Sequence, residues 1–255
     1  IIDASRMRSL DAELLSSGLP EAALMEKVGQ AMAARLLREP QWLQAGAVVL
    51  VGPGHNGGDG LVVARELLLR GIRVRIWCPF DVRKPLTESH YRHLIWLGVE
   101  CCQHEPDPAE STLWIDGLFG VGQTRPLPSS LESLLSDRAD AQPNGLISLD
   151  VPSGLCSDSG HPLGRVAAVA RLTLSVGLIK QGLCLDPARP FVGLLERVDL
   201  GLAERQHQGL VATQPRRFDG ADLASMPLPR PSANAMKYQR GRLLVIAGSE
   251  RYPGA

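Results

Sequence analysis

Apolar residues recur at helical spacing along the first part of the chain, over residues 5–38. The tripeptide GLP at residues 18–20 interrupts this pattern, because glycine and proline disfavour the interior of a helix. We therefore expect two helices, which form an N-terminal helical extension before the first strand.

From residue 47 onward, short continuous apolar runs alternate with helical patterns. The runs predict strands over residues 47–51, 72–78, 112–115, 145–149 and 171–176, and the periodic segments predict helices over residues 59–70, 87–97 and 129–138. Unbroken apolar runs are typical of strands that are buried on both faces of a sheet. The alternation therefore predicts an α/β fold with a doubly wound, mostly parallel sheet and helices on both of its faces.

The pattern changes after about residue 201. Residues 213–231 are rich in proline, small and polar residues, which favours a linker, so residues 1–212 are expected to form one domain. A further apolar run, GRLLVIAG at residues 241–248, ends in a Gly/Ser turn, and the helix that should cover such a strand does not follow. We interpret residues 232–255 as the severed start of a second α/β unit.

The composition indicates a globular protein whose partner is a small molecule. Hydrophobic residues make up 44% of the 255 residues, which is ample for a core. Lys+Arg and Asp+Glu both number 27, so the zero formal charge gives no electrostatic footprint for nucleic acid or an anionic membrane. The five cysteines show no CxxC spacing, and neither a run of 18 apolar residues nor a signal peptide is visible. We expect reduced thiols and a cytoplasmic protein without membrane contact.

The most informative stretch is VGPGHNGGDGLVVAR at residues 51–65, which follows a predicted strand and opens a helix at about Asp59. Its first glycines are Gly52, Gly54, Gly57 and Gly58. Glycines let a backbone turn sharply and approach a ligand, and the free amides at a helix start attract phosphate. The GxGxxG spacing matches the dinucleotide-binding fingerprint, but the acidic residue expected at the end of the second strand is missing. The oxygen atoms of Asn56 and Asp59 suit a hard cation or a sugar hydroxyl.

Two further loops follow predicted strands, WIDGLFGVGQTRP at residues 114–126 and LDVPSGLCSDSG at residues 149–160. Asp116 and Asp150 stand at the ends of these strands, where open α/β sheets bind their ligands. We expect both to converge with Asp59 on one crevice, where a cation, a proton or hydrogen bonds must relieve their repulsion, and a bound cation is the simplest relief. Residues 120–122 and Arg125 could cradle phosphates, although Arg125 could instead form a surface ion pair.

The histidines give weaker signals. His90 and His93 have the spacing of metal ligands on a predicted helix, but no cysteine or carboxylate completes a zinc site, so we expect both to face solvent. His55 lies inside the glycine loop and either contacts the ligand or is an exposed loop side chain. Ser153 lacks the GxSxG context of a nucleophilic serine.

The motifs GPGHNGGDGLVVAR, IDGLFGVGQTRP and LDVPSG, in this order, closely resemble those of the NAD(P)H-hydrate epimerase family, and the resemblance spans about residues 5–200. The segment ALMEKVG at residues 23–29 is similar to the N-terminal helix motif of that family. The resemblance implies a Rossmann-like fold, a homodimer, and inversion of the C6 stereocentre of hydrated NADH or NADPH. These hydrates are damaged cofactors that a dehydratase then restores.

The resemblance also implies roles for individual residues, with Asp150 as the key acid/base. The ligands of a potassium ion would be Asn56, Asp116 and Ser153. The substrate-binding residues would be His55, Asn56, Gly57, Gly58, Asp59, Gly120, Val121, Gly122, Gln123, Thr124, Arg125, Pro126 and Asp150. The family usually has asparagine where this chain has His55, so we expect the affinity for substrate to vary with pH. Lys27 also replaces an asparagine, in the N-terminal helix motif, which concerns packing or dimer contacts rather than the chemistry.

Residues 232–255 resemble the start of the ADP-dependent NAD(P)H-hydrate dehydratase, a ribokinase-like domain. We therefore interpret the chain as the front half of a bifunctional repair enzyme, with the dehydratase domain in cis. Two alternatives stay open. The GxGxxG match favours a nicotinamide-dependent oxidoreductase, although the missing ribose-binding acid argues against it. A non-catalytic nucleotide-binding or scaffold module of the same fold would be signalled by loss of Asp150 or of the cation ligands, all of which are present.

Overall fold

The computed structural model describes residues 1–202, 214–218, 220–226 and 232–236. The chain divides into two compact units, Ile1–Pro215 and Arg216–Ala255. A short helix, α8 (Gly220–Ser225), belongs to the second unit and lies within the segment that the sequence assigns to a linker. The strand predicted at residues 241–248 lies outside the described residues. The extent of the two domains and of the linker stays a prediction.

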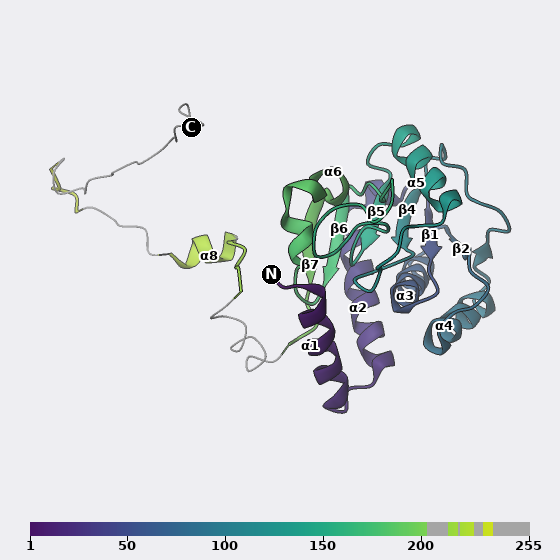
Figure 1. Ribbon diagram of the computed structural model, residues 1–255, viewed down its shortest axis with the longest axis horizontal. Helices are drawn as coiled ribbons and strands as arrows, with labels where there is room; N and C mark the ends of the chain where they lie inside the picture. Colours follow the sequence, from purple (N-terminus) through teal and green to yellow (C-terminus); the bar gives the residue numbers. More distant parts are fainter. Residues whose placement is uncertain (203–213, 219, 227–231, 237–255) are drawn as a thin grey trace. The chain divides into compact units, whose positions relative to one another are not determined.

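Seven parallel strands form one sheet in the first unit (Figure 1). They are β1 (Ala47–Val51), β2 (Val74–Trp77), β3 (Glu100–Cys101), β4 (Leu113–Gly117), β5 (Leu146–Leu149), β6 (Leu172–Val176) and β7 (Leu194–Val198). The strand order is β3-β2-β1-β4-β5-β6-β7, so the chain winds outward from β1 in one direction and from β4 in the other. This order confirms the predicted doubly wound α/β fold and places its reversal between β1 and β4.

The sequence pattern predicted the five inner strands and missed β3 and β7, which form the two edges. The strand β3 has two residues, and β7 carries Glu196 and Arg197 within the run LLERV. An edge strand pairs on one side only and is more exposed than an inner strand, so it needs no continuous apolar run. The pattern of apolar residues therefore found the buried centre of the sheet and not its borders.

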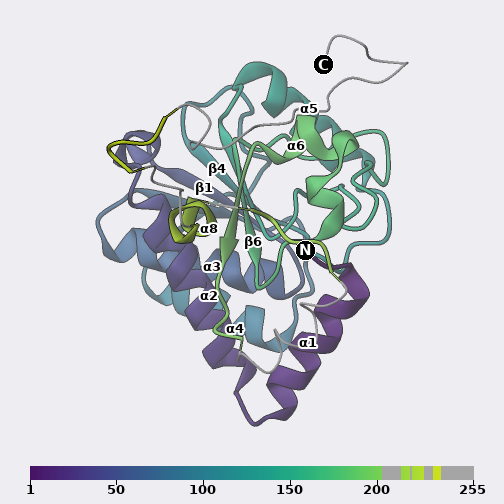
Figure 2. The same ribbon diagram turned by 90° about the vertical axis from the view of Figure 1, so that its left-hand side faces the viewer.

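The α-helices beside the sheet are α1 (Ala4–Ser16), α2 (Glu21–Leu36), α3 (His55–Leu69), α4 (Pro85–Trp96), α5 (Ser129–Ala141) and α6 (Arg189–Val192), and the 3₁₀ helices are η1 (Pro40–Leu43), η2 (Gln181–Cys184) and η3 (Asp186–Ala188). Val49 and Val51 of β1 pack in one buried cluster with α1 to α4, whereas Val48 and Leu50 pack in another with α5. Helices thus cover both faces of the sheet, as predicted (Figures 1 and 2). In the described ranges, no helix is long and apolar enough to cross a bilayer.

The helix α3 begins at His55, four residues before the predicted start at Asp59. The glycines of this loop are poor helix formers, which hid the first turn from the sequence pattern. They are needed for close packing, because a Cβ atom at Gly52 would overlap the backbone of Leu118, and one at Gly57 would overlap the carbonyl of Gly52. None of the four loop glycines has a positive φ. The expected sharp turn is therefore a close approach of backbone segments, in which Gly52, before α3, meets Leu118 of the loop after β4 and the first turn of α3 packs on Gly52.

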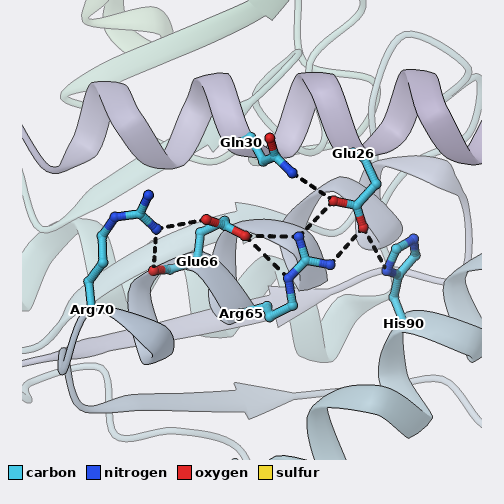
Figure 3. A network of polar contacts seen from close by, with 6 residues as sticks. All are labelled: Glu26, Gln30, Arg65, Glu66, Arg70 and His90. Carbon is cyan, nitrogen blue, oxygen red and sulfur yellow. Dashed lines mark hydrogen bonds and ion pairs between the residues drawn. The ribbon is translucent and has the colours of Figure 1, made fainter.

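A network of polar contacts ties α2, α3 and α4 together (Figure 3). Arg65 of α3 donates two hydrogen bonds to Glu26 of α2, at 2.6 and 2.7 Å. His90 of α4 lies 3.8 Å from Glu26, and its side chain is 13% exposed. The expectation that His90 faces solvent is therefore wrong, because its ring is half-buried and lies against the Glu26 carboxylate. His93 is exposed and stacks on Trp96.

Candidate functional site

A cavity of about 480 Å³ lies at the carboxyl ends of the central strands of the sheet. The loops that follow β1 and β4 line it, together with the first residue after β5 and side chains of α1 and α2. The strand order reverses between β1 and β4, and open α/β sheets bind ligands at such a reversal. The topology therefore places the cavity where a ligand is expected.

Asp150 directly follows β5 and projects into the cavity. Its φ is 65°, a left-handed conformation that costs a non-glycine residue about 1–2 kcal/mol. Hydrogen bonds hold it there, since its N–H donates to Leu174 at 2.8 Å and its Oδ2 accepts from the N–H of Val121 at 2.9 Å. Residues in strained conformations that their surroundings fix are typical of functional sites.

Lys180 is the partner of Asp150, and sequence reasoning missed it. Its Nζ donates to Asp150 Oδ1 at 2.5 Å and to the carbonyl of Val176 at 2.6 Å, and its side chain is 1% exposed. The backbone on either side of Lys180 pairs with Ile2, through bonds of 2.9 Å from Ile2 to Ile179 and 2.8 Å from Gln181 to Ile2. The one signal in the sequence is a lysine that follows the apolar run of β6. The ammonium gives the Asp150 carboxylate a buried counter-charge.

Two more carboxyl groups line the same cavity, Asp59 from α3 and Asp11 from α1. Burial raises the pKa of Asp59 well above its usual range, and the carboxylates of Asp150 and Asp11 add to this. Burial also raises the pKa of Asp11 to about 6, although the Lys180 ammonium opposes the rise. The structure thus brings Asp59 and Asp150 together, as expected, and adds Asp11, which belongs to no motif.

Asp116 does not line the cavity, which corrects the expectation of three convergent carboxylates. It is fully buried, and its Oδ1 accepts from the Ser153 hydroxyl at 2.6 Å. Its Oδ2 accepts from the Ser148 hydroxyl at 3.0 Å and from the Ser153 N–H at 2.9 Å. Burial raises the pKa of Asp116, and these hydrogen bonds oppose the rise. The Ser153 hydroxyl also accepts from the N–H of Phe119 at 3.0 Å, so the pair supports the loop that lines the cavity.

Asn56 is the unsatisfied polar group of the site. It lines the cavity, and both its Oδ1 and its Nδ2 are buried without a hydrogen-bond partner. Buried polar groups in folded proteins normally have partners, so an unpaired carboxamide indicates a missing ligand or ion. A Cβ atom at Gly120 would stand 2.8 Å from Asp150 Oδ2 and 3.4 Å from Asn56 Cγ. The glycine therefore keeps the space between these two side chains open.

The start of α3 points its free backbone amides toward the cavity, since Gly54 is the N-cap and offers no side chain to satisfy them. The Thr87 hydroxyl holds this turn by donating to the Gly54 carbonyl at 2.9 Å. Lys84 and Arg8 also line the cavity, and both are exposed. Amides at a helix start and two cations form a suitable environment for phosphate groups.

The remaining substrate-binding candidates fall into two groups. Those that line the cavity are His55, Asn56, Asp59, Gly120, Val121, Gly122, Gln123 and Asp150. Gly57 and Gly58 are buried beneath them, and Thr124, Arg125 and Pro126 are exposed beyond the lining segment. Burial and the neighbouring Lys84 lower the pKa of His55, although Glu21, whose carboxylate lies 3.2 Å from His55 Nε2, opposes this.

Comparisons with known proteins identify the family of this chain. The family described as YjeF-related protein N-terminus matches residues 21–182. The bifunctional NAD(P)H-hydrate repair enzyme Nnr of Thermosynechococcus vestitus is 39% identical over 258 residues, which cover 100% of this chain and 50% of that protein. The NAD(P)H-hydrate epimerase of Oenococcus oeni is 31% identical over 189 residues, which cover 73% of this chain and 89% of that protein.

A solved structure has the same fold. The crystal structure of yeast ynu0 aligns with a TM-score of 0.66 and 21% sequence identity, and the alignment covers 87% of this chain and 97% of that one. The chain spans about half the length of the bifunctional relatives that it matches. On the match over residues 21–182, the chain belongs to the family of YjeF-related N-terminal domains.

Proposed function

We propose that the domain predicted over residues 1–212 is an NAD(P)H-hydrate epimerase, which inverts C6 of hydrated NADH and NADPH. The observation that carries this proposal is the Asp150–Lys180 ion pair in a cavity at the strand-order reversal. A buried carboxylate with a fixed conformation is suited to accept and return a proton. Relatives over the same segment carry the name of this activity, which supports the assignment.

The C6 hydroxyl is on the carbon next to the ring nitrogen. Inversion at C6 requires either the C6–O bond or the ring to break and re-form on the other face, and a proton must move when it does. Asp150 moves this proton, and Lys180 holds its carboxylate in place. Acid–base help of this kind accelerates reactions by about 10²- to 10⁴-fold. The cavity accelerates the reaction further by orienting the ring against Asp150.

The substrate contacts follow from the lining of the cavity. The diphosphate lies at the free amides of α3, with the exposed cations Lys84 and Arg8 nearby. The ring lies against Asp150 and beside the segment of residues 120–123, which lines the same cavity. Thr124, Arg125 and Pro126, which are exposed, contact the outer edge of the substrate. Gly57 and Gly58, which lie in the first turn of α3, let its backbone approach the substrate.

Asn56, Asp116 and Ser153 would hold a potassium ion. The buried, unpaired Oδ1 of Asn56 is the observation that fits such an ion, and the hydroxyl and carboxylate of the other two residues are hard oxygen donors. Of these three side chains only Asp116 carries a carboxylate, so the donor set has low charge, which suits a monovalent cation. When bound, the ion supplies positive charge that positions substrate and loop.

The wider context of the domain is also proposed. A dehydratase domain follows in cis in the complete protein, as the names of the bifunctional relatives suggest. The protein works as a homodimer in the cytoplasm, without nucleic acid or membrane partners. None of the five cysteines, all of which lie in the described residues, forms a disulfide.

The proposal is tested by incubating the purified S and R forms of hydrated NADH separately with the protein and following their interconversion by chromatography, in potassium chloride and in choline chloride. We expect interconversion above the spontaneous rate, stimulated by potassium. Asp150→Asn should lower the rate at least ~10²-fold, whereas Asp137→Asn, on the exposed face of α5, should not.

The rival functions predict other results. If the folded protein does not accelerate the interconversion of the epimers, the result would favour a non-catalytic binding or scaffold module. Hydride transfer from NADH to a carbonyl compound would instead support the oxidoreductase, which the residues after β2 disfavour, since no acid ends that strand.

A further inference from the structure

The helix α1 forms a wall of the cavity although it lies outside the segment that matches the family, residues 21–182. Its side chains Met7, Arg8, Asp11 and Leu15 line the cavity. The family match therefore does not extend to this wall.

The position of α1 is fixed at several points. Its N-cap Asp3 accepts from the N–H of Arg6 at 2.8 Å, and Asp158 Oδ1 accepts from the N–H of Ala4 at 2.7 Å. Met7 and Leu10 are buried, at 1% and 2% exposure. Because Ile2 pairs beside Lys180, the start of the chain is anchored next to the lysine that holds Asp150. The wall is thus a docked part of the domain and not a loose extension.

Asp11 is the acidic side chain that this wall presents to the cavity. No hydrogen bond or ion pair engages its carboxyl within the described part of the chain, yet it interacts electrostatically with Asp150 and Lys180. The lining also holds Asp59 on α3 and four other charged or titratable groups, which are Arg8, Glu21, His55 and Lys84. An unpartnered, half-buried carboxyl that shares a cavity with an ion-paired one can hold a proton that its neighbour has lost.

We propose that Asp11 is a second catalytic residue of the epimerase, which shares one proton with Asp150 across the substrate ring. This inference rests on the proposed function. Asp150 is ion-paired and accepts the proton in one direction, and Asp11, which no cation pairs directly, donates it. The two groups line one cavity from different elements, α1 and the end of β5, and the proposal requires the ring to enter between them.

One epimer is converted into the other by loss and re-addition of water at C6. Asp11 gives its proton to the C6 hydroxyl, the C6–O bond breaks with its electron pair on oxygen, water leaves, and the nitrogen lone pair forms a C6=N1 double bond. Water then adds to the other face of C6, the π electrons return to nitrogen, and Asp150 accepts the proton of the water. The other epimer follows the reverse route, with the proton on Asp150 at the start. No oxidant, reductant or further reactant is required.

Asp59 is the competing carboxyl, but it suits this role less well. Burial raises the pKa of Asp59 well above its usual range, so that it holds its proton tightly, whereas the pKa of Asp11 is about 6. A proton donor works best when its pKa lies near the working pH. Asp59 is also part of the first turns of α3, where the phosphate-binding amides lie.

The test compares Asp11→Asn with Asp11→Glu and with Glu13→Gln, a control that removes an exposed carboxyl from the same helix. We expect Asp11→Asn to lower kcat in both directions by about 10²-fold with substrate affinity changed by less than about threefold, and Asp11→Glu to restore part of the loss. Glu13→Gln should equal the wild type. Circular dichroism confirms that each variant is folded.

Two further readouts separate chemistry from structure. The wild-type rate should fall as pH rises above about 6, because the pair then loses its shared proton, and Asp11→Asn should lack this fall. In water enriched in oxygen-18, each inversion should place one solvent oxygen on C6.

An Asp11→Asn variant with the wild-type kcat and pH dependence, or inversion without oxygen exchange, would overturn the role of Asp11 while leaving the epimerase intact. A wild-type protein that does not interconvert the epimers would instead overturn the proposed function itself, and the role of Asp11 with it.

Discussion

Lys180 Nζ lies 2.5 Å from Oδ1 of Asp150, in an ion pair whose side chains are 1% and 10% exposed. The pair joins the loop after β6 to the end of β5, beneath the cavity. A buried ion pair adds little net stability compared with an apolar pair, but the loss of one partner leaves an uncompensated charge. We therefore expect the loss of either residue alone to destabilise the protein more than the loss of both.

Replacement of Lys180 by methionine should lower the free energy of unfolding by about 3 kcal/mol, because the Asp150 carboxylate would lose its counter-charge. Asp150→Asn should be destabilising for the converse reason, and the double variant should recover most of the loss. None of the three should epimerise at the wild-type rate. Urea unfolding measures the stabilities in a double-mutant cycle. Additive losses in the double variant would mean that the two side chains do not interact as described.

The stability of the protein should fall as pH rises from about 4 to 6, owing to Asp11. Burial raises the pKa of its carboxyl to about 6 in the folded protein, so the folded state binds more protons than the unfolded state in this window. The full effect would be ~3 kcal/mol, and we expect roughly 1 kcal/mol because the carboxyl is partly exposed and screened by water.

Asp11→Asn removes this charge, so the variant should be more stable than the wild type at pH 8 and equal to it at pH 4. Thermal unfolding at the two pH values, with Glu13→Gln as the matched control, measures the difference. A variant that loses stability at pH 8 would show that the Asp11 carboxylate is favourably paired.

The residues that sequence reasoning placed at the site share one property, which is that each stands in a contiguous motif beside an inner strand. Asn56 and Asp150 follow β1 and β5, and parallel strands bring their carboxyl ends to the same edge of the sheet. Apolar runs predict such strands well, so the positions of these residues follow from the pattern alone.

Lys180 and Asp11 could not be found in this way. Lys180 reaches Asp150 because the start of the chain pairs beside it, and Asp11 reaches the cavity because α1 docks there. Both contacts join distant parts of the sequence, and neither residue has a motif. The sequence placed Asp116 correctly at a strand end. That position does not determine whether the side chain points into the cavity, and here it accepts hydrogen bonds from Ser148 and Ser153 instead.

Potassium should stabilise the wild-type protein, and Asn56 should be required for this. A cation that binds only the folded state raises the midpoint of thermal unfolding, by roughly 3 °C at tenfold excess over the Kd. Asn56→Ala removes the unpaired Oδ1 and should abolish the difference between potassium chloride and choline chloride. Gln103→Ala, which removes an exposed carboxamide elsewhere, is the control. Equal midpoints of the wild type in both salts would exclude the proposed ion.

Gly120→Ala should disturb the site through Asp150. The added Cβ atom would stand 2.8 Å from Asp150 Oδ2, which also accepts the hydrogen bond from Val121. Either the loop or the carboxylate must move, so we expect a loss of about 1–2 kcal/mol in stability and at least ~10-fold in kcat.

Gly122→Ala separates this contact from a general effect of an added methyl group in the same loop. No heavy atom lies within 4 Å of the position that its Cβ would take, and its φ is not positive, so the free energy of unfolding should stay equal or rise by about 0.5 kcal/mol. Urea unfolding of both variants measures the contrast. Gly120 and Gly122 variants of equal stability, with kcat of Gly120→Ala unchanged, would show that Asp150 has more room than the structure gives it, and that its strained conformation is not fixed by this loop.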